Sequence, residues 1–231
     1  MQKFKHYSFD LWLTLIKSNP EFKLKRTTFF YENFNRSKKS LSEVGTIFRK
    51  VDLMCNSINE RTGKNIESIE MYLIVICLIN DYSISLNEID LNYVGREMEN
   101  LFFQYAPVIY SSETYEVLKY LKQQGNTTSI LSNTGFIPGA MLRKVLTDMG
   151  IGSYLDFQIY SDEVGISKPN REIFEIMVSK AADNKRDERL NLTDILHVGD
   201  NPTADIAGAK SFGIASLLIN SNNVSITSLL A

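Results

Sequence analysis

The feature that most constrains the fold of this chain is the placement of polar residues after short apolar segments. In the first apolar run, Phe4 to Leu15, the carboxylate Asp10 ends a short hydrophobic segment and Thr14 follows four residues later. An Asp after a strand is frequently a turn residue or a helix cap, so Asp10 alone does not define a site. Three more polar groups follow strand-like segments further along the chain, namely Ser132-Asn133-Thr134, Lys168-Pro169 and Gly199-Asp200-Asn201. Because the ligand crevice of an open α/β sheet lies at the carboxyl ends of its strands, all four groups are expected to line such a crevice.

Residues 18–105 show the apolar spacing of helices. Asn19-Pro20 is typical of a helix start, and Ser40 with Glu43 matches a capping box. Further helices are expected over residues 67–81 and 87–103, so that the region forms a helical bundle without strands. We interpret its aromatic residues as core. We interpret its charged side chains mostly as solvated helix faces, and we expect that one or two of them point into a crevice. The charged side chains are Lys23, Lys25, Arg26, Lys38, Lys39 and Arg49.

From Ser111 onward, helical and strand-like segments alternate. Strands are expected at residues 127–131, 155–160, 195–198 and 215–219, and helices at 112–124, 138–149, 171–182 and 203–212. This alternation predicts an α/β fold with a doubly wound parallel sheet covered by helices on both faces. The charged run at residues 184–189 is expected to be a solvated loop.

The composition favours an ordinary globular protein of 231 residues, with 44% hydrophobic and 23% charged residues. The formal net charge of −2 gives no electrostatic reason to expect nucleic acid or a membrane as partner. No signal peptide is expected, and the longest apolar run, Met71 to Ile79, is too short to cross a bilayer of about 30 Å. Cys55 and Cys77 lie in apolar helical segments and are expected to be free thiols. These features predict a cytoplasmic protein and leave its oligomeric state open.

Taken together, the four polar groups resemble the motifs of the haloacid dehalogenase (HAD) superfamily of hydrolases. The first motif of the phosphatases in this family, Asp-x-Asp-x-Thr, is matched by Asp10-Leu11-Trp12-Leu13-Thr14. The later motifs are matched by Ser132-Asn133, by Lys168-Pro169 and by Gly199-Asp200-Asn201-Pro202-Thr203-Ala204-Asp205. The resemblance implies a HAD-like, Rossmannoid α/β core domain made of residues 1–17 and 106–231. It also implies that residues 18–105 are an inserted, all-helical cap domain.

The resemblance implies a nucleophile and a metal site as well. It assigns Asp10 as the nucleophile and Mg²⁺ as the cofactor, held by Asp10, Asp200 and the backbone carbonyl of Trp12. A carboxylate attacks phosphorus only where its own charge and that of the phosphate are screened, which agrees with a divalent cation and a nearby lysine, Lys168. The implied substrate is a small phosphorylated compound. Its contacts are assigned to Thr14, Ser132, Asn133, Lys168 and Trp12, with Asn201 and Asp205 supporting the site.

Several of these residues also have a purely structural interpretation. Lys168 fits an exposed loop, and Asp200 fits the cap of the next helix. Asp205 falls in the first turn of that helix, where an acidic residue interacts favourably with the helix dipole. Asn201 fits a turn, and His197, within an apolar strand, is expected to be a core histidine.

The sequence departs from the family pattern at Trp12, where the phosphatases have their second Asp, the general acid and base. An indole N–H donates a hydrogen bond but does not exchange its proton in the range of water. General acid–base catalysis contributes about 10²–10⁴-fold, so hydrolysis of phosphomonoesters is expected to be lost or slow.

Two branches of the family also lack this Asp. Haloacid dehalogenases have a Tyr there, require an arginine from early in the cap and lack the acidic ligand of the fourth motif. The phosphonate-cleaving branch has a small residue there and uses a cap lysine. Because two unscreened carboxylates repel each other, the retention of Asp200 opposite Asp10 favours a magnesium site. We therefore expect a magnesium-dependent hydrolase. Two alternatives stay open, a metal-independent 2-haloacid dehalogenase and a catalytically silent protein that binds phosphate and metal.

Overall fold

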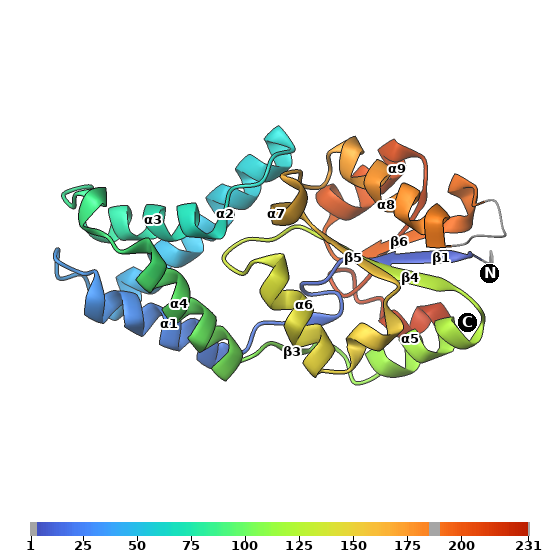
Figure 1. Ribbon diagram of the computed structural model, residues 1–231, viewed down its shortest axis with the longest axis horizontal. Helices are drawn as coiled ribbons and strands as arrows, with labels where there is room; N and C mark the ends of the chain where they lie inside the picture. Colours follow the sequence, from blue (N-terminus) through green and yellow to red (C-terminus); the bar gives the residue numbers. More distant parts are fainter. Residues whose placement is uncertain (1–3, 185–189, 231) are drawn as a thin grey trace.

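The computed structural model describes residues 4–184 and 190–230. A parallel sheet flanked by helices occupies one part of the molecule, and four helices lie beside it (Figure 1). The sheet has the strand order β5-β4-β1-β6-β7, and all neighbouring strands are parallel. The strands are β1 (His6–Phe9), β4 (Thr127–Ser132), β5 (Phe157–Tyr160), β6 (Ile195–Gly199) and β7 (Ala215–Leu218).

The central strand β1 is fully buried. Its last residue, Phe9, is paired with Ile130 of β4 on one side and with Val198 of β6 on the other. From β1 the strand order runs outward in both directions, so the carboxyl end of β1 is the switch point where open α/β sheets bind ligands. Asp10 comes directly after this strand, and its backbone N–H donates to the carbonyl of Val198 (2.8 Å).

Helices cover both faces of the sheet, which confirms the predicted doubly wound α/β fold (Figure 1). One core contains side chains of β1 together with the helices α5 (Thr114–Gln123) and α6 (Gly139–Asp148) and the C-terminal 3₁₀ turn η5 (Ile226–Leu230). A second core contains α8 (Arg171–Asn184) and α9 (Gly208–Phe212). The shorter elements of this part are η2 (Ile151–Tyr154), α7 (Ser161–Val164) and η3 (Leu192–Asp194).

The four helices beside the sheet have a core of their own, built largely from aromatic and aliphatic side chains. They are α1 (Pro20–Asn33), α2 (Leu41–Thr62), α3 (Ser68–Ile79) and α4 (Leu91–Gln104), with a 3₁₀ turn η1 (Leu86–Glu88) before α4. Asn19 caps α1, and the predicted capping box of Ser40 and Glu43 is present at the start of α2. The predicted helix over 87–103 begins later, at Leu91, because Asp90 caps it by accepting from the N–H of Tyr93.

Two short strands connect these helices to the sheet. They are β2 (Ile16–Lys17) and β3 (Val108–Ile109), which pair antiparallel. Neither strand was predicted, because a strand of two residues has no apolar alternation to detect.

The helix predicted over 203–212 is wrong in its first half. Residues Pro202–Ala207 form a π-helical segment, η4, and only Gly208–Phe212 form the α-helix α9. The side chain of Asn201 accepts from the N–H groups of Thr203 and Ala204, and the N–H of Ile206 reaches back to the Asn201 carbonyl. Such wide turns are frequent at functional sites.

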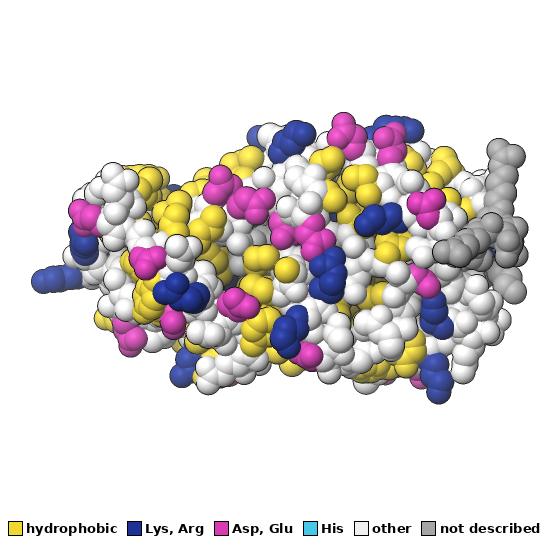
Figure 2. Space-filling view, viewed as in Figure 1, with side chains coloured by type: hydrophobic (Ala, Val, Ile, Leu, Met, Phe, Trp, Pro, Cys, Tyr) yellow, Lys and Arg dark blue, Asp and Glu magenta, His cyan; other side chains and the backbone are white. Residues whose placement is uncertain are grey.

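Of the charged run at 184–189, residues 185–189 lie outside the described part, and Asn184 ends α8. Cys55 and Cys77 are free thiols, as predicted. Among the described residues, none of the helices combines the length and the apolar character needed to cross a membrane. Figure 2 shows side chains of both charge signs interspersed over one face of the molecule.

Candidate active site

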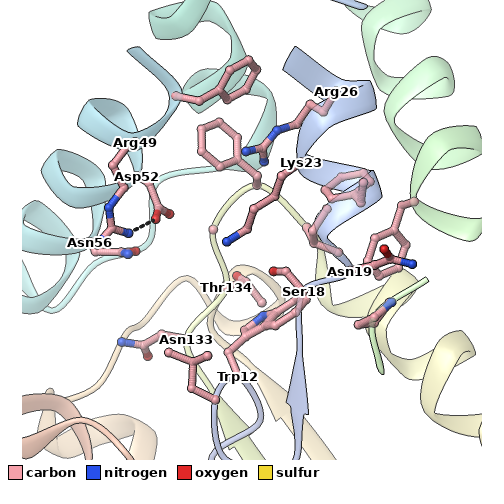
Figure 3. A pocket seen from close by; sticks show the side chains of 18 of the residues that line it. Trp12, Ser18, Asn19, Lys23, Arg26, Arg49, Asp52, Asn56, Asn133 and Thr134 are labelled. Atoms are coloured by element: carbon pink, nitrogen blue, oxygen red, sulfur yellow. Dashed lines mark hydrogen bonds and ion pairs between the residues drawn. The ribbon is translucent and has the colours of Figure 1, made fainter. Parts of the chain in front are cut away.

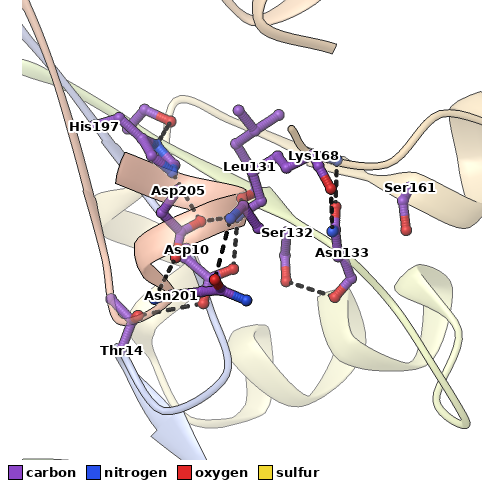
Figure 4. A network of polar contacts seen from close by, with 12 residues as sticks. Asp10, Thr14, Leu131, Ser132, Asn133, Ser161, Lys168, His197, Asn201 and Asp205 are labelled. Carbon is purple, nitrogen blue, oxygen red and sulfur yellow. Dashed lines mark hydrogen bonds and ion pairs between the residues drawn. The ribbon is translucent and has the colours of Figure 1, made fainter. Parts of the chain in front are cut away.

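Asp10 lies buried at the carboxyl end of β1, with both of its carboxylate oxygens hydrogen-bonded (Figure 4). Oδ1 accepts from the ammonium of Lys168 at 2.8 Å, and Oδ2 accepts from the hydroxyl of Thr14 at 3.2 Å. Thr14, predicted to contact substrate, is itself fully buried, and the contact seen here is with the candidate nucleophile. These two hydrogen bonds fix the orientation of the Asp10 carboxylate.

Lys168 is 1% exposed, so it is not the surface loop residue of the structural interpretation. Its ammonium also donates to Asp205 Oδ1 and to the carbonyl of Leu131, both at 2.6 Å. Its backbone is clamped by the Asn133 amide, which accepts from Lys168 N–H (2.7 Å) and donates to Lys168 C=O (2.9 Å). Asn133 therefore positions the lysine, a role that differs from its predicted contact with substrate.

Asp205 is 1% exposed and lies at the centre of a polar network (Figure 4). Besides Lys168, its carboxylate contacts His197 Nε2 (3.2 Å) and accepts from the N–H of Asn201 (2.9 Å). His197 is fully buried, as expected for a core histidine, and its other ring nitrogen contacts the hydroxyl of Ser8 (3.1 Å). Asp205 thus contacts Lys168, His197 and Asn201. These contacts would not be needed if the only role of Asp205 were to interact with the helix dipole.

Three carboxylates come together at this point. Oxygen atoms of Asp10, Asp200 and Asp205 all lie within 4.8 Å of one another. Burial is the main cause that raises the pKa of Asp10 to about 7, and Asp205 adds to it while Lys168 opposes it. Burial, together with Asp205, raises the pKa of Asp200 to about 6. The cluster without a cation is therefore electrostatically unfavourable for its ionised carboxylates.

The pKa values of Asp205 and Lys168 are shifted mainly by neighbouring charges and hydrogen bonds, which outweigh the effect of burial. Burial alone would raise the pKa of Asp205, but the ammonium of Lys168 and the hydrogen bond from His197 hold it below its usual range. Burial alone would lower the pKa of Lys168, but Asp10 and Asp205 outweigh burial and raise it. Lys168 and Asp205 therefore remain an ion pair, which offsets one of the three negative charges.

The remaining charges fit a divalent cation. With all three carboxylates ionised and Lys168 protonated, the cluster carries two uncompensated negative charges. Closely spaced carboxylate oxygens are the hard donors that Mg²⁺ prefers. The residues present therefore suit this ion.

A cavity of about 830 Å³ lies between the carboxyl edge of the sheet and the helices α1 and α2. Asp10, Trp12, Asn133 and Asp200 line it from the sheet side. Ser132, predicted to bind substrate oxygens, is fully buried and its hydroxyl donates to the carbonyl of Asn133. Trp12 faces the cavity at its floor (Figure 3).

The other wall of the cavity carries residues whose role the sequence did not reveal. Charged and amide side chains of α1 and α2 line it: Lys23, Arg26, Arg49, Asp52 and Asn56 (Figure 3). Glu60 of α2 lines it as well. Helical spacing assigns a side chain to a helix face, but only the packing of the helices against the sheet determines which face looks into the cavity. Glu60 accepts from the side chain of Asn201 (2.9 Å) and so joins the two walls.

The family of the chain follows from its match to known proteins. A model of the haloacid dehalogenase-like hydrolases matches residues 5–213. The chain belongs to this family. Pyrimidine 5'-nucleotidase YjjG of Escherichia coli is 30% identical over 100 residues, which are 43% of this chain and 41% of the relative. Glyceraldehyde 3-phosphate phosphatase of Methanothermobacter thermautotrophicus is 32% identical over 110 residues, 47% of this chain and 43% of the relative.

These alignments span less than half the length of each of the two relatives. Solved structures of the HAD family match over nearly the whole chain and show the fold. The putative HAD-hydrolase YfnB from Bacillus subtilis, bound to magnesium, has a TM-score of 0.71 at 15% identity, covering 95% of this chain and 90% of that one. The HAD phosphatase from Thermococcus onnurineus has a TM-score of 0.66 at 21% identity, covering 95% and 87%.

Proposed function

We propose that this HAD-family protein is a Mg²⁺-dependent hydrolase that removes phosphate from a small phosphorylated compound, with Asp10 as nucleophile. The observation that carries the proposal is the placement of Asp10 against the buried Lys168 ammonium and within 4.8 Å of the Asp200 and Asp205 carboxylates. Relatives named as a pyrimidine 5'-nucleotidase, a ribulose-1,5-bisphosphate 5-phosphatase and a glyceraldehyde 3-phosphate phosphatase support a phosphate ester as the substrate class.

The residues of the site account for the binding of the reacting group. Asp10 and Asp200 would hold the Mg²⁺ ion, with the carbonyl of Trp12 as a further oxygen ligand. When bound, the ion would supply positive charge that screens the nucleophile and the phosphate from each other. Lys168 holds Oδ1 of Asp10 at 2.8 Å and Thr14 holds Oδ2 at 3.2 Å, and together they orient the carboxylate at the edge of the cavity where the phosphate would bind. Neighbouring backbone N–H groups are proposed to contact the phosphate oxygens, because the Ser132 hydroxyl and the Asn133 amide are already hydrogen-bonded within the protein.

The reaction that these residues support has two steps. A carboxylate oxygen of Asp10 forms a bond to phosphorus while the bond from phosphorus to the ester oxygen breaks, and the alcohol leaves with a proton. Water then attacks the phosphorus of the aspartyl phosphate, releasing inorganic phosphate and restoring Asp10. Trp12 supplies no proton in either step. The proton comes from another residue, from the substrate or from solvent, and we expect slow turnover of esters with poor leaving groups.

We also propose that α1 to α4, within residues 18–105, act as the cap of this hydrolase. Side chains of α1 and α2, together with Phe102 of α4, form the wall of the cavity that faces Asp10. A cap in this position controls which molecules reach the nucleophile, and it limits the access of water.

The experiment that tests the proposal is an assay of purified protein with a panel of phosphate esters and with 2-haloacids, with and without Mg²⁺. We expect phosphate release that requires Mg²⁺ and disappears in Asp10→Asn. Asp148→Asn, which changes an exposed carboxylate paired with Lys144, is the matched control and keeps activity. Halide release without metal would replace the proposal by a dehalogenase, and binding of esters without any product would replace it by a silent binding protein.

A further inference from the structure

Arg26 of α1 lies on the cap wall of the cavity, with its guanidinium surrounded by aromatic rings. The guanidinium carbon is 4.2 Å from the ring centre of Phe48, 4.6 Å from that of Phe136 and 5.4 Å from that of Phe22. Phe48 and Phe136 are almost completely buried. These rings hold the guanidinium in one place and remove much of the water that would otherwise solvate its charge.

No anionic partner compensates this charge within the described residues. Arg26 forms no ion pair within 4.0 Å there, and its Nε is buried without a hydrogen-bond partner. Asp52 is an electrostatic neighbour, but its carboxylate pairs with Arg49 at 3.2 Å. The other neighbour, Tyr72, is neutral. Its hydroxyl oxygen accepts a hydrogen bond from the Arg26 side chain, and its hydroxyl proton is donated to the carbonyl of Phe136 (3.0 Å).

A desolvated guanidinium without a counter-charge is unfavourable unless it has another use. Lys23 lies three residues earlier on the same helix, also lines the cavity, and has no ion pair among the described side chains. Residues three apart in a helix project from the same side. In Figure 3, Lys23 reaches from α1 toward the sheet side of the cavity, where Trp12 and Thr134 lie. Two cations of α1 thus line the cavity that Asp10 also lines, Arg26 among the aromatic rings and Lys23 exposed to solvent.

We propose that Arg26, assisted by Lys23, binds a second anionic group of the substrate, a carboxylate or a second phosphate at the end remote from the phosphate that is transferred. The inference rests on the proposed function, because Asp10 and Lys168 already provide the site of the reacting phosphate on the opposite wall. A guanidinium fork matches both carboxylate and phosphate oxygens. The apolar rings between the two walls would accommodate a short carbon skeleton.

The test compares matched phosphate esters in the presence of Mg²⁺. Phosphorylated ω-hydroxycarboxylic acids of increasing chain length are assayed beside neutral alkyl phosphates of the same lengths, and bisphosphates of the matching diols form a third set. Charge-assisted hydrogen bonds to a desolvated arginine correspond to about 10- to 100-fold in binding. We expect a preference of this size for an anionic set at one chain length, and the better set identifies the anion.

Variants of Arg26 separate binding from a structural role. Arg26→Met is expected to abolish the preference by raising KM for the anionic esters, while kcat/KM for the neutral esters is retained. The thermal midpoint should also be retained, since an apolar side chain fits among the rings. Arg26→Lys should restore part of the preference. Arg36→Met, which removes an exposed arginine paired with Glu88, is the matched control and keeps it. Equal losses for neutral and anionic esters, together with a lower thermal midpoint, would show that Arg26 is only structural and overturn the inference.

A binding measurement keeps this inference distinct from the proposed function. Calorimetric titration of Asp10→Asn with the same esters reports affinity without turnover. If the unmodified protein hydrolyses no ester, but the anionic set binds more tightly than the neutral set and this difference is lost in Arg26→Met, the hydrolase proposal fails and the anion site stands. If esters are hydrolysed with no preference for a second anion, the hydrolase stands and the anion site is wrong.

Discussion

At the scale of single residues, Lys168 is the group on which the others in the site depend. Its ammonium donates to Asp10, Asp205 and a backbone carbonyl, so each of its three protons has an acceptor. A buried cation between two carboxylates contributes little net stability compared with an apolar core, but its removal leaves two like charges uncompensated. Lys168 therefore contributes to the stability of the fold as well as to the orientation of Asp10.

Lys168→Met should abolish phosphate release and lower the free energy of unfolding by about 3–5 kcal/mol, the usual cost of breaking a buried ion pair. Urea unfolding measures the second effect. Lys144→Met, which breaks an exposed pair with Asp148, should change stability by less than about 1 kcal/mol. Full stability of Lys168→Met would mean that Asp10 and Asp205 do not share the lysine in solution.

Trp12→Asp should raise the phosphatase rate, because it places a proton donor and acceptor where the indole now faces the cavity. A competent general acid and base contributes about 10²–10⁴-fold, and a newly introduced one should recover part of this factor in kcat. Asn is similar in size to Asp but does not transfer a proton. Trp12→Asn therefore separates the effect of proton transfer from the effect of the space left by the indole. An equal rate in the two variants would refute the account of Trp12.

At the scale of elements, the turn from β6 into η4 determines where Asp205 lies. Gly199 ends β6, and a Cβ at this position would overlap the Asp205 carboxylate. The absence of a side chain there allows Asp205 to approach the strand and reach both His197 and Lys168. The glycine is thus required by close packing, and the π-helical segment supplies the wide turn that brings the carboxylate back toward the strand.

Gly199→Ala should therefore displace Asp205, release Lys168 from one of its partners and abolish activity while lowering the thermal midpoint. Gly95→Ala on α4 is the matched control, because an added Cβ there meets nothing within 4 Å. Alanine in a helix is more favourable than glycine, so this control should gain about 0.5–1 kcal/mol. Normal activity in Gly199→Ala would show that the contact between Gly199 and Asp205 is not required.

At the scale of the whole molecule, the carboxylate cluster links metal binding to stability. Magnesium that binds the folded chain at a hundredfold excess over its dissociation constant adds about 2.7 kcal/mol. For a chain of this length, that corresponds to an increase of about 5–10 °C in Tm. Differential scanning calorimetry with MgCl₂ measures the increase, and Asp200→Asn should remove most of it. An increase that persists in Asp200→Asn would place the ion elsewhere.

The sequence predicted those parts of the molecule that local patterns determine. The Ser40 and Glu43 capping box and the doubly wound sheet follow from residues close in sequence or from regular alternation, and the structure confirms both. The grouping of Asp10, Lys168 and Asp200 followed from a family resemblance and from strand ends meeting at one edge. The clamp of Asn133 on Lys168 and the aromatic surroundings of Arg26 depend on contacts between distant segments, which no local pattern encodes.

The two short strands β2 and β3 lie side by side, so the chain leaves the sheet region and returns to it at neighbouring points. A segment inserted in this way closes on itself, and changes in its length or content do not shift the register of β1 against β4 and β6. The contacts of Gly63 and Asn65 with Ser167 and Ser161, and that of Glu60 with Asn201, are among the features that such changes would need to retain. Within that limit, changes in residues 18–105 would alter the cavity wall, and with it the choice of substrate, while the strand that presents Asp10 stays unchanged.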